Sequence, residues 1–146
     1  MKTLFKKISI LLIVLASGMS SCSKNDDSPP PTTAELLTNK WFLVKQEDLS
    51  TTPPTVYVAD ACEQNGNLNF MANGALSLET FSMDVNSACV SDGVETGSYV
   101  LSANEDQLQI TTGSPPGTET WDIDTLTQSE LILIIGSGSG KVYLSR

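Results

Sequence analysis

The residue types best suited to chemistry lie between positions 84 and 95, where oxygen-bearing side chains have the spacing of a calcium-binding loop. Asp84, Asn86, Asp92 and Glu95 occupy the first, third, ninth and twelfth positions of such a loop, where side-chain oxygens would hold the ion. The sixth position, which needs glycine for a sharp turn, is Cys89. We therefore favour a solvated acidic loop over a calcium site.

The chain contains no histidine, which removes the commonest general base and the commonest zinc ligand. A serine nucleophile would then need a lysine as its base, and Lys40, Lys45 and Lys141 lie in no recognisable catalytic motif. The glycine-rich run 136–140 leads into an expected strand, whereas a phosphate-binding loop leads into a helix, so we expect a flexible hairpin there. The sequence predicts no enzyme activity, no catalytic residue, no metal and no cofactor.

The charge of the chain excludes a further class of function. The sequence has 17 Asp and Glu against 8 Lys and Arg, with a formal net charge of −9. Such a chain repels phosphate backbones, so we expect no nucleic-acid partner. Its 146 residues suit one domain, and a domain of that size buries roughly two thirds of its unfolded surface. We expect a monomer that needs no metal to fold.

Residues 1–21 have the organisation of a secretory signal peptide. A start with three lysines precedes an apolar run over residues 8–16, then a short polar stretch, then Cys22. The run is too short to span a bilayer, which takes roughly 20 apolar residues. The segment Met19-Ser20-Ser21-Cys22 resembles the lipobox of bacterial lipoproteins. That resemblance implies lipid attachment at Cys22, palmitate being the expected acyl group, and the alternative is an ordinary signal peptide with an incidental cysteine.

Residues 22–32 are expected to form a flexible, proline-rich tether that starts at the acylated cysteine. Removal of residues 1–21 would leave five basic and 17 acidic side chains, a formal net charge of −12, so the acyl chains would supply the membrane affinity. Residues 23–28 are similar to the short acidic signal of surface-exposed lipoproteins of Bacteroidota-type bacteria, although a solvated linker is an equal alternative. We expect lipid anchoring in the outer membrane. The sequence is compatible with a protein on the cell surface and with one on the periplasmic face.

Residues 33–146 have the pattern of an all-β domain. Thr32 and Glu35 have capping-box spacing and predict a short helix over residues 32–38. Asn73-Gly74 between two alternating runs predicts a hairpin, and the prolines cluster outside the expected strands. Apolar and β-branched runs predict strands over residues 41–45, 55–59, 67–71, 75–81, 95–102, 107–112, 118–123, 130–135 and 141–144.

Short connections between so many strands favour an up-and-down antiparallel β-barrel of about eight strands, since a closed barrel has no exposed edge. With Cys22 assigned to lipid, Cys62 and Cys89 remain in an oxidising compartment, where a disulfide is favoured over a reactive or metal-binding pair. An immunoglobulin-like sandwich would place a tryptophan between its paired cysteines, but Trp41 and Trp121 lie outside that interval. The sandwich stays the less favoured alternative.

The pattern resembles the lipocalin-like domains of secreted Bacteroidota lipoproteins. The opening segment 36–44, with Leu37, Asn39 and Trp41 in order, is similar to the family's opening, although Asn39 stands where the family has glycine. The likeness continues through residues 97–101, 107–110, 119–126 and 141–144. It implies that Trp41 closes one end of the barrel under an arginine, and Arg146 is the sole arginine in the sequence.

Two functions remain open at this stage. The resemblance implies a noncatalytic binder of a small hydrophobic ligand. In the second hypothesis the barrel core is filled and the protein is a structural or interaction module that acts through loops at residues 50–55 and 85–92. An eight-stranded barrel is just wide enough for either arrangement. The aromatic residues that would line a ligand cavity or fill the core are Trp41, Phe70, Phe81, Tyr99 and Trp121.

Overall fold

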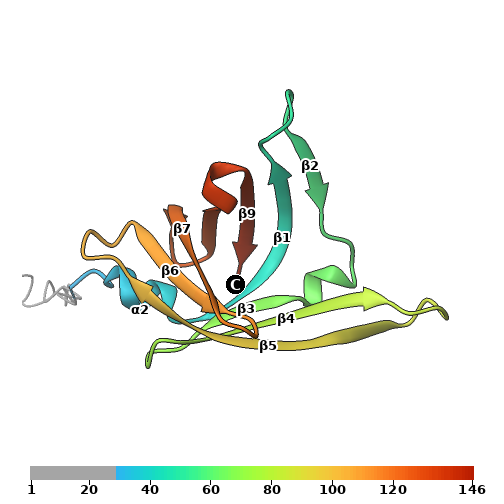
Figure 1. The fold of residues 1–146 in the computed structure, drawn as a ribbon, viewed down its shortest axis with the longest axis horizontal. Coiled ribbons are helices and arrows are strands. Elements are labelled where there is room, and N and C mark those ends of the chain that lie inside the picture. Colours follow the sequence, from blue (N-terminus) through green and yellow to red (C-terminus); the bar gives the residue numbers. More distant parts are fainter. Residues whose placement is uncertain (1–28) are drawn as a thin grey trace, which may run out of the picture. The chain divides into compact units, whose positions relative to one another are not determined.

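A computed structural model describes residues 29–146 of the chain, and Figure 1 shows their fold. The expected signal peptide, the expected lipid attachment at Cys22 and residues 23–28 lie outside the described residues. Within the described part, no helix has both the length and the apolar character needed to cross a membrane.

Strands dominate the described residues. In chain order the elements are α2 (Thr33–Leu37), β1 (Lys40–Asp48), β2 (Thr55–Val58), the 3-10 turn η1 (Glu63–Asn65), β3 (Asn67–Phe70), β4 (Ala75–Met83), β5 (Cys89–Leu101), β6 (Gln107–Thr112), β7 (Gly117–Leu126), β8 (Glu130–Ile135), the 3-10 turn η2 (Gly136–Gly138) and β9 (Gly140–Ser145). Each expected run of residues coincides with one of these strands, and the predicted helix forms with Thr32 as its N-cap and the capping box to Glu35 in place.

The sheet closes on itself. Strands β3 to β9 follow one another as antiparallel neighbours, and β9 returns to pair with β1. The first part of β1 pairs with β3, and its last part pairs with β2, which therefore lies beside the eight-stranded ring and does not belong to it. The expected closed antiparallel barrel of about eight strands is confirmed.

The Asn73-Gly74 hairpin between β3 and β4 is also confirmed. The Gly74 N–H donates to the Met71 carbonyl at 2.9 Å, and the Met71 N–H donates to the Ala75 carbonyl at 2.9 Å. Of the two turn residues Gly74 alone has a positive φ, 81°. The hairpin thus depends on the freedom of a glycine at position 74.

The core follows the two-residue period of the strands. Leu68 and Phe70 on β3 and Leu108 and Ile110 on β6 are buried, because alternate side chains of each strand point into the barrel. Leu78, Trp121 and Ile123 are partly buried and pack against this cluster. The two-residue alternation in these strands therefore marks the inner face of the barrel.

The β4–β5 hairpin is longer than the sequence indicates. β5 starts at Cys89, which pairs with Met83, so residues 89–92 belong to a strand and not to the loop expected over residues 85–92. Val90 and Val94 are exposed, and no residue of β5 before Gly97 is buried. Residues 89–96 of β5 extend beyond the core and show no alternation of apolar and polar residues, so the sequence pattern does not predict a strand over all of them.

Candidate functional site

One end of the barrel is closed around Trp41. Its side chain is fully buried, and its indole N–H donates to the Leu37 carbonyl at 3.0 Å, at the end of α2. The Arg146 guanidinium lies 5.0 Å from the centre of the Trp41 ring and donates to the Leu36 and Gln128 carbonyls. The resemblance implied this pairing. This cation–π contact holds Arg146 over the Trp41 ring at the closed end of the barrel.

Two more of the five aromatic candidates belong to this closed end. Phe70 is buried, and its ring meets the Tyr99 ring edge to face at 5.0 Å between ring centres. The Tyr99 hydroxyl donates to the Met71 carbonyl at 2.9 Å, which satisfies its polar group. Trp41 and Phe70 therefore belong to the core, and Tyr99 packs against it.

The other two aromatic candidates line a cavity toward the opposite end of β1. Its volume is about 370 Å³, and Phe81 on β4 and Trp121 on β7 contribute to its wall. The Trp121 indole N–H donates to Glu119 at 3.2 Å, which fixes the ring on that wall. The remaining apolar lining comes mainly from aliphatic side chains of five strands, namely Leu43, Leu68, Leu78, Leu133, Val142 and Leu144.

The polar part of the cavity lining, called the rim below, includes two acidic residues. Glu63 from η1 and Glu79 from β4 both belong to the lining and are half-buried. Glu79 accepts from the Asn67 amide at 3.3 Å and from the Ser91 hydroxyl at 3.1 Å, and Glu63 accepts from the Asp60 N–H at 2.9 Å. No lysine or arginine lines the cavity within residues 29–146.

A disulfide holds the polar rim in place. Because β3 is short, η1 packs between β1 and β4 just before the first residue of β3. There the Leu43 N–H donates to the Gly66 carbonyl at 3.1 Å. Cys62, just before η1, is bonded to Cys89 at the start of β5, with 5.4 Å between their Cα atoms. The expected disulfide is confirmed, and it ties the segment that carries Glu63 to the β4–β5 hairpin.

The acidic segment 84–95 is not arranged around an ion. Asp84 lies in the β4–β5 turn, where its carboxylate accepts from the Ala88 and Asn86 N–H groups, and these bonds lower its pKa. Asp92, on β5, accepts from the Ser82 hydroxyl. The described residues contain no group of three or more acidic, histidine or cysteine side chains that could hold a metal. The Asp84 carboxylate stabilises the β4–β5 turn through its hydrogen bonds.

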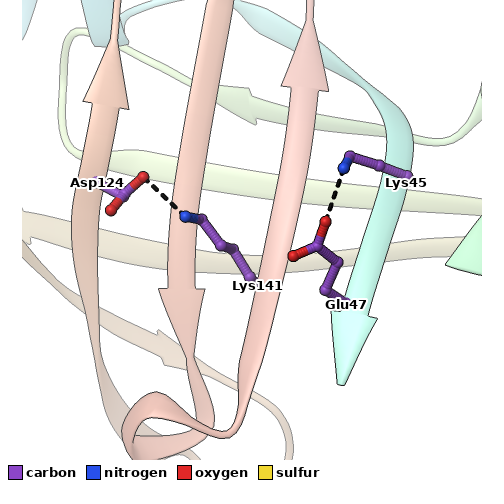
Figure 2. Close-up of polar contacts among 4 residues, drawn as sticks. All are labelled: Lys45, Glu47, Asp124 and Lys141. Atoms are coloured by element: carbon purple, nitrogen blue, oxygen red, sulfur yellow. Dashed lines mark hydrogen bonds and ion pairs between the residues drawn. The ribbon is translucent and has the colours of Figure 1, made fainter. Parts of the chain in front are cut away.

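Two ion pairs lie on the barrel wall formed by β7, β8, β9 and β1 (Figure 2). The Lys45 Nζ atom lies 2.7 Å from Oε1 of Glu47, and the Nζ atom of Lys141 on β9 lies 3.0 Å from Oδ2 of Asp124 on β7. Lys45 also lies 3.8 Å from the centre of the Tyr143 ring. The hydrogen bond between Lys45 and Glu47 raises the pKa of Lys45 and lowers that of Glu47, and the bond from Asp124 raises the pKa of Lys141.

These shifts predict how the pairs respond to pH. The pKa of Glu47 lies below its ordinary 4.5, so its contribution to stability is complete above that value and is lost as pH falls through the lower folded value. The contribution of Lys45 is complete below 10.5 and is lost as pH rises through the raised folded value. We expect Glu47→Gln to lower the unfolding temperature slightly at neutral pH and to have no effect in acid, once Glu47 is protonated in both states.

Thermal unfolding followed by circular dichroism at neutral and acid pH measures this difference. Glu130→Gln is the matched control, because it removes the same charge from an exposed residue that forms no ion pair with another described residue. An effect of Glu47→Gln that is as large in acid as at neutral pH would contradict the assignment.

A closed antiparallel barrel, capped at one end by a buried tryptophan under an arginine and hollow toward the other, is the architecture of a lipocalin-like protein. The chain belongs to the lipocalin-like domain family, whose model matches residues 37–133. Its fold is similar to that of a lipocalin-like protein from Bacteroides uniformis ATCC 8492, with a TM-score of 0.55 and 18 % identity over 76 % of this chain and 98 % of that chain. The comparison with curated proteins gives no match.

Sequence reasoning found part of this site and missed its rim. Phe81 and Trp121 were named as candidates, whereas Glu63 and Glu79 were not. Glu63 lies between two strands in a segment without periodicity, and Glu79 alternates with apolar residues, a pattern that does not distinguish a cavity residue from an exposed one. The position of Cys62 next to Glu63 is the one signal that could have drawn attention to this segment.

Proposed function

We propose that this protein is a lipid-anchored envelope lipoprotein whose barrel binds a small apolar ligand without catalysing a reaction. The observation that carries the proposal is the cavity of about 370 Å³, floored by aliphatic side chains and walled by Phe81 and Trp121. Small-molecule sites in proteins are about 300–1,000 Å³ and are lined mainly by apolar and aromatic side chains with a few polar groups. The lipocalin-like fold supports the same function.

Native mass spectrometry of the protein after mild extraction tests the binding proposal. We expect a co-purifying small molecule, or binding of an added long-chain alcohol that changes the fluorescence of Trp121. A bare protein that also fails to bind apolar probes of any head group would contradict the proposal.

The noncatalytic part of the proposal is supported by the absence of histidine, the commonest general base, from the sequence. Measured turnover of an ester or a glycoside would overturn it.

Lipid anchoring at Cys22 in the outer membrane is supported by the order of the signal segment and the cysteine that ends it. The mass of the mature N-terminus tests it. We expect a chain that begins at an acylated Cys22. An unmodified Cys22, or cleavage at another residue, would contradict the anchoring.

A second candidate function, protein interaction, is favoured by one observation. β2 lies beside the ring as an edge strand, and its apolar side chains Val56, Tyr57 and Val58 are 52 %, 70 % and 69 % exposed. An exposed apolar edge strand is able to pair with another chain. This function would be favoured over ligand binding if the protein binds no apolar probe but binds a protein partner, and if Tyr57→Lys abolishes that partner's binding.

A further inference from the structure

We infer that the cavity selects an apolar ligand with a cationic head, such as a primary amine on an alkyl chain, over the corresponding fatty acid. This inference rests on the proposed function, because it assigns the chemical class of the ligand that the same cavity takes. It follows from the pairing of an apolar floor with a carboxylate rim.

The two rim carboxylates have neutral partners. Glu79 accepts hydrogen bonds from Asn67 and Ser91, and Glu63 accepts one from the Asp60 N–H. Neither forms an ion pair with a lysine or arginine among the described residues. A ligand would therefore have no ion-pair partner from residues 29–146 to displace from these two carboxylates.

The lysine that borders the neighbouring hollow has partners of its own. Lys45 borders a neighbouring hollow together with Glu63, but its ammonium group lies 2.7 Å from Glu47 and over the ring of Tyr143. Lys141, on the same wall, is paired with Asp124. Both lysines of this wall are thus paired with carboxylates other than those of Glu63 and Glu79.

An alkyl ammonium ion fits this arrangement. A carboxylate has about four acceptor positions and an ammonium group has three donors, so Glu63 and Glu79 retain acceptor capacity beyond the hydrogen bonds that they already form. The alkyl chain would lie on the floor formed by residues such as Leu133 and Val142, while the charged head would stay at the half-buried rim and keep contact with water.

A fatty acid would meet the opposite conditions. Its carboxylate would lie beside two like charges at a half-buried site, where the attraction or repulsion between charges is stronger than in bulk water. The acidic chain as a whole, with 17 acidic against 8 basic residues, adds to the repulsion of an anion as it approaches.

Titration with decylamine, decanol and decanoate distinguishes the contribution of the head group to binding from that of the alkyl tail, because the three probes differ mainly in the head group. Isothermal titration calorimetry should be performed below the concentration at which each probe forms micelles. We expect the wild-type protein to bind decylamine at least about tenfold more tightly than decanoate, with decanol between them.

The double variant Glu63→Gln/Glu79→Gln should lose most of this preference and still bind decanol. Glu130→Gln is the matched control, since it removes the same charge from a residue outside the cavity lining, and we expect it to keep the preference.

The three probes also distinguish the two proposals. Equal binding of decylamine, decanol and decanoate, or a preference that survives in the double variant, would overturn the head-group inference and leave the proposed ligand binding intact. If none of the probes binds, decanol included, both proposals are wrong.

Discussion

Replacement of Trp41 by alanine is expected to lower the free energy of unfolding by about 3–5 kcal/mol, the usual cost of truncating a fully buried aromatic side chain. The ring is completely buried among the core residues of the closed end. The change would also remove the contact with the Arg146 guanidinium and the hydrogen bond to the Leu37 carbonyl. Urea unfolding followed by circular dichroism measures the loss.

Tyr57→Ala is the control for this prediction. Tyr57 is 70 % exposed on β2, so its truncation should change the free energy of unfolding by about 0.5 kcal/mol or less. If Trp41→Ala does not fold, Trp41→Phe keeps an aromatic ring in the core and should show a smaller loss. Equal stability of the Trp41→Ala and Tyr57→Ala variants would contradict the account of the closed end.

Removal of the disulfide is expected to have the second largest effect. The bond joins residues 27 positions apart, and the chain-entropy model gives about 3.5 kcal/mol for a loop of that length. We expect the double variant Cys62→Ala/Cys89→Ala to lose about that free energy of unfolding in urea. Alanine is preferred to serine because Cys62 is buried, and a hydroxyl there would need a hydrogen-bond partner.

The wild-type protein in the presence of a reductant is the matched comparison, since it loses the same bond without a change of sequence. Both should unfold at similar urea concentrations. The same reduction should weaken ligand binding, because the bond holds η1, and with it Glu63, against the β4–β5 hairpin. A reduced protein as stable as the oxidised one would contradict this role.

The ring of strands was predictable because its signals are local. The alternation in Leu108 and Ile110, the Asn73-Gly74 turn and the capping box of Thr32 and Glu35 each depend on residues a few positions apart. The position of β2 beside the ring was not predictable. It depends on where β1 changes partner from β3 to β2, and no residue pattern marks that point.

The candidate site was predictable in kind and not in detail. Five aromatic residues were named, but their division between the closed end and the cavity depends on how far along its strand each lies. Asn39 shows the same limit. Its carbonyl accepts from the distant Phe70 N–H, and Asn39 has no positive φ, so the position does not need the conformational freedom of the family's glycine.

Binding of decanol to a variant with a blocked cavity tests the central claim most directly. Val142 lines the cavity, so Val142→Phe would place a ring in the space that a ligand needs. Val100→Phe is the matched control, because Val100 is 62 % exposed on β5 and does not line the cavity. Calorimetry should show wild-type binding in Val100→Phe and a loss of at least about tenfold in Val142→Phe, with the fold intact by circular dichroism. Decanol binding of equal strength in both variants would contradict the claim that this cavity is the ligand site.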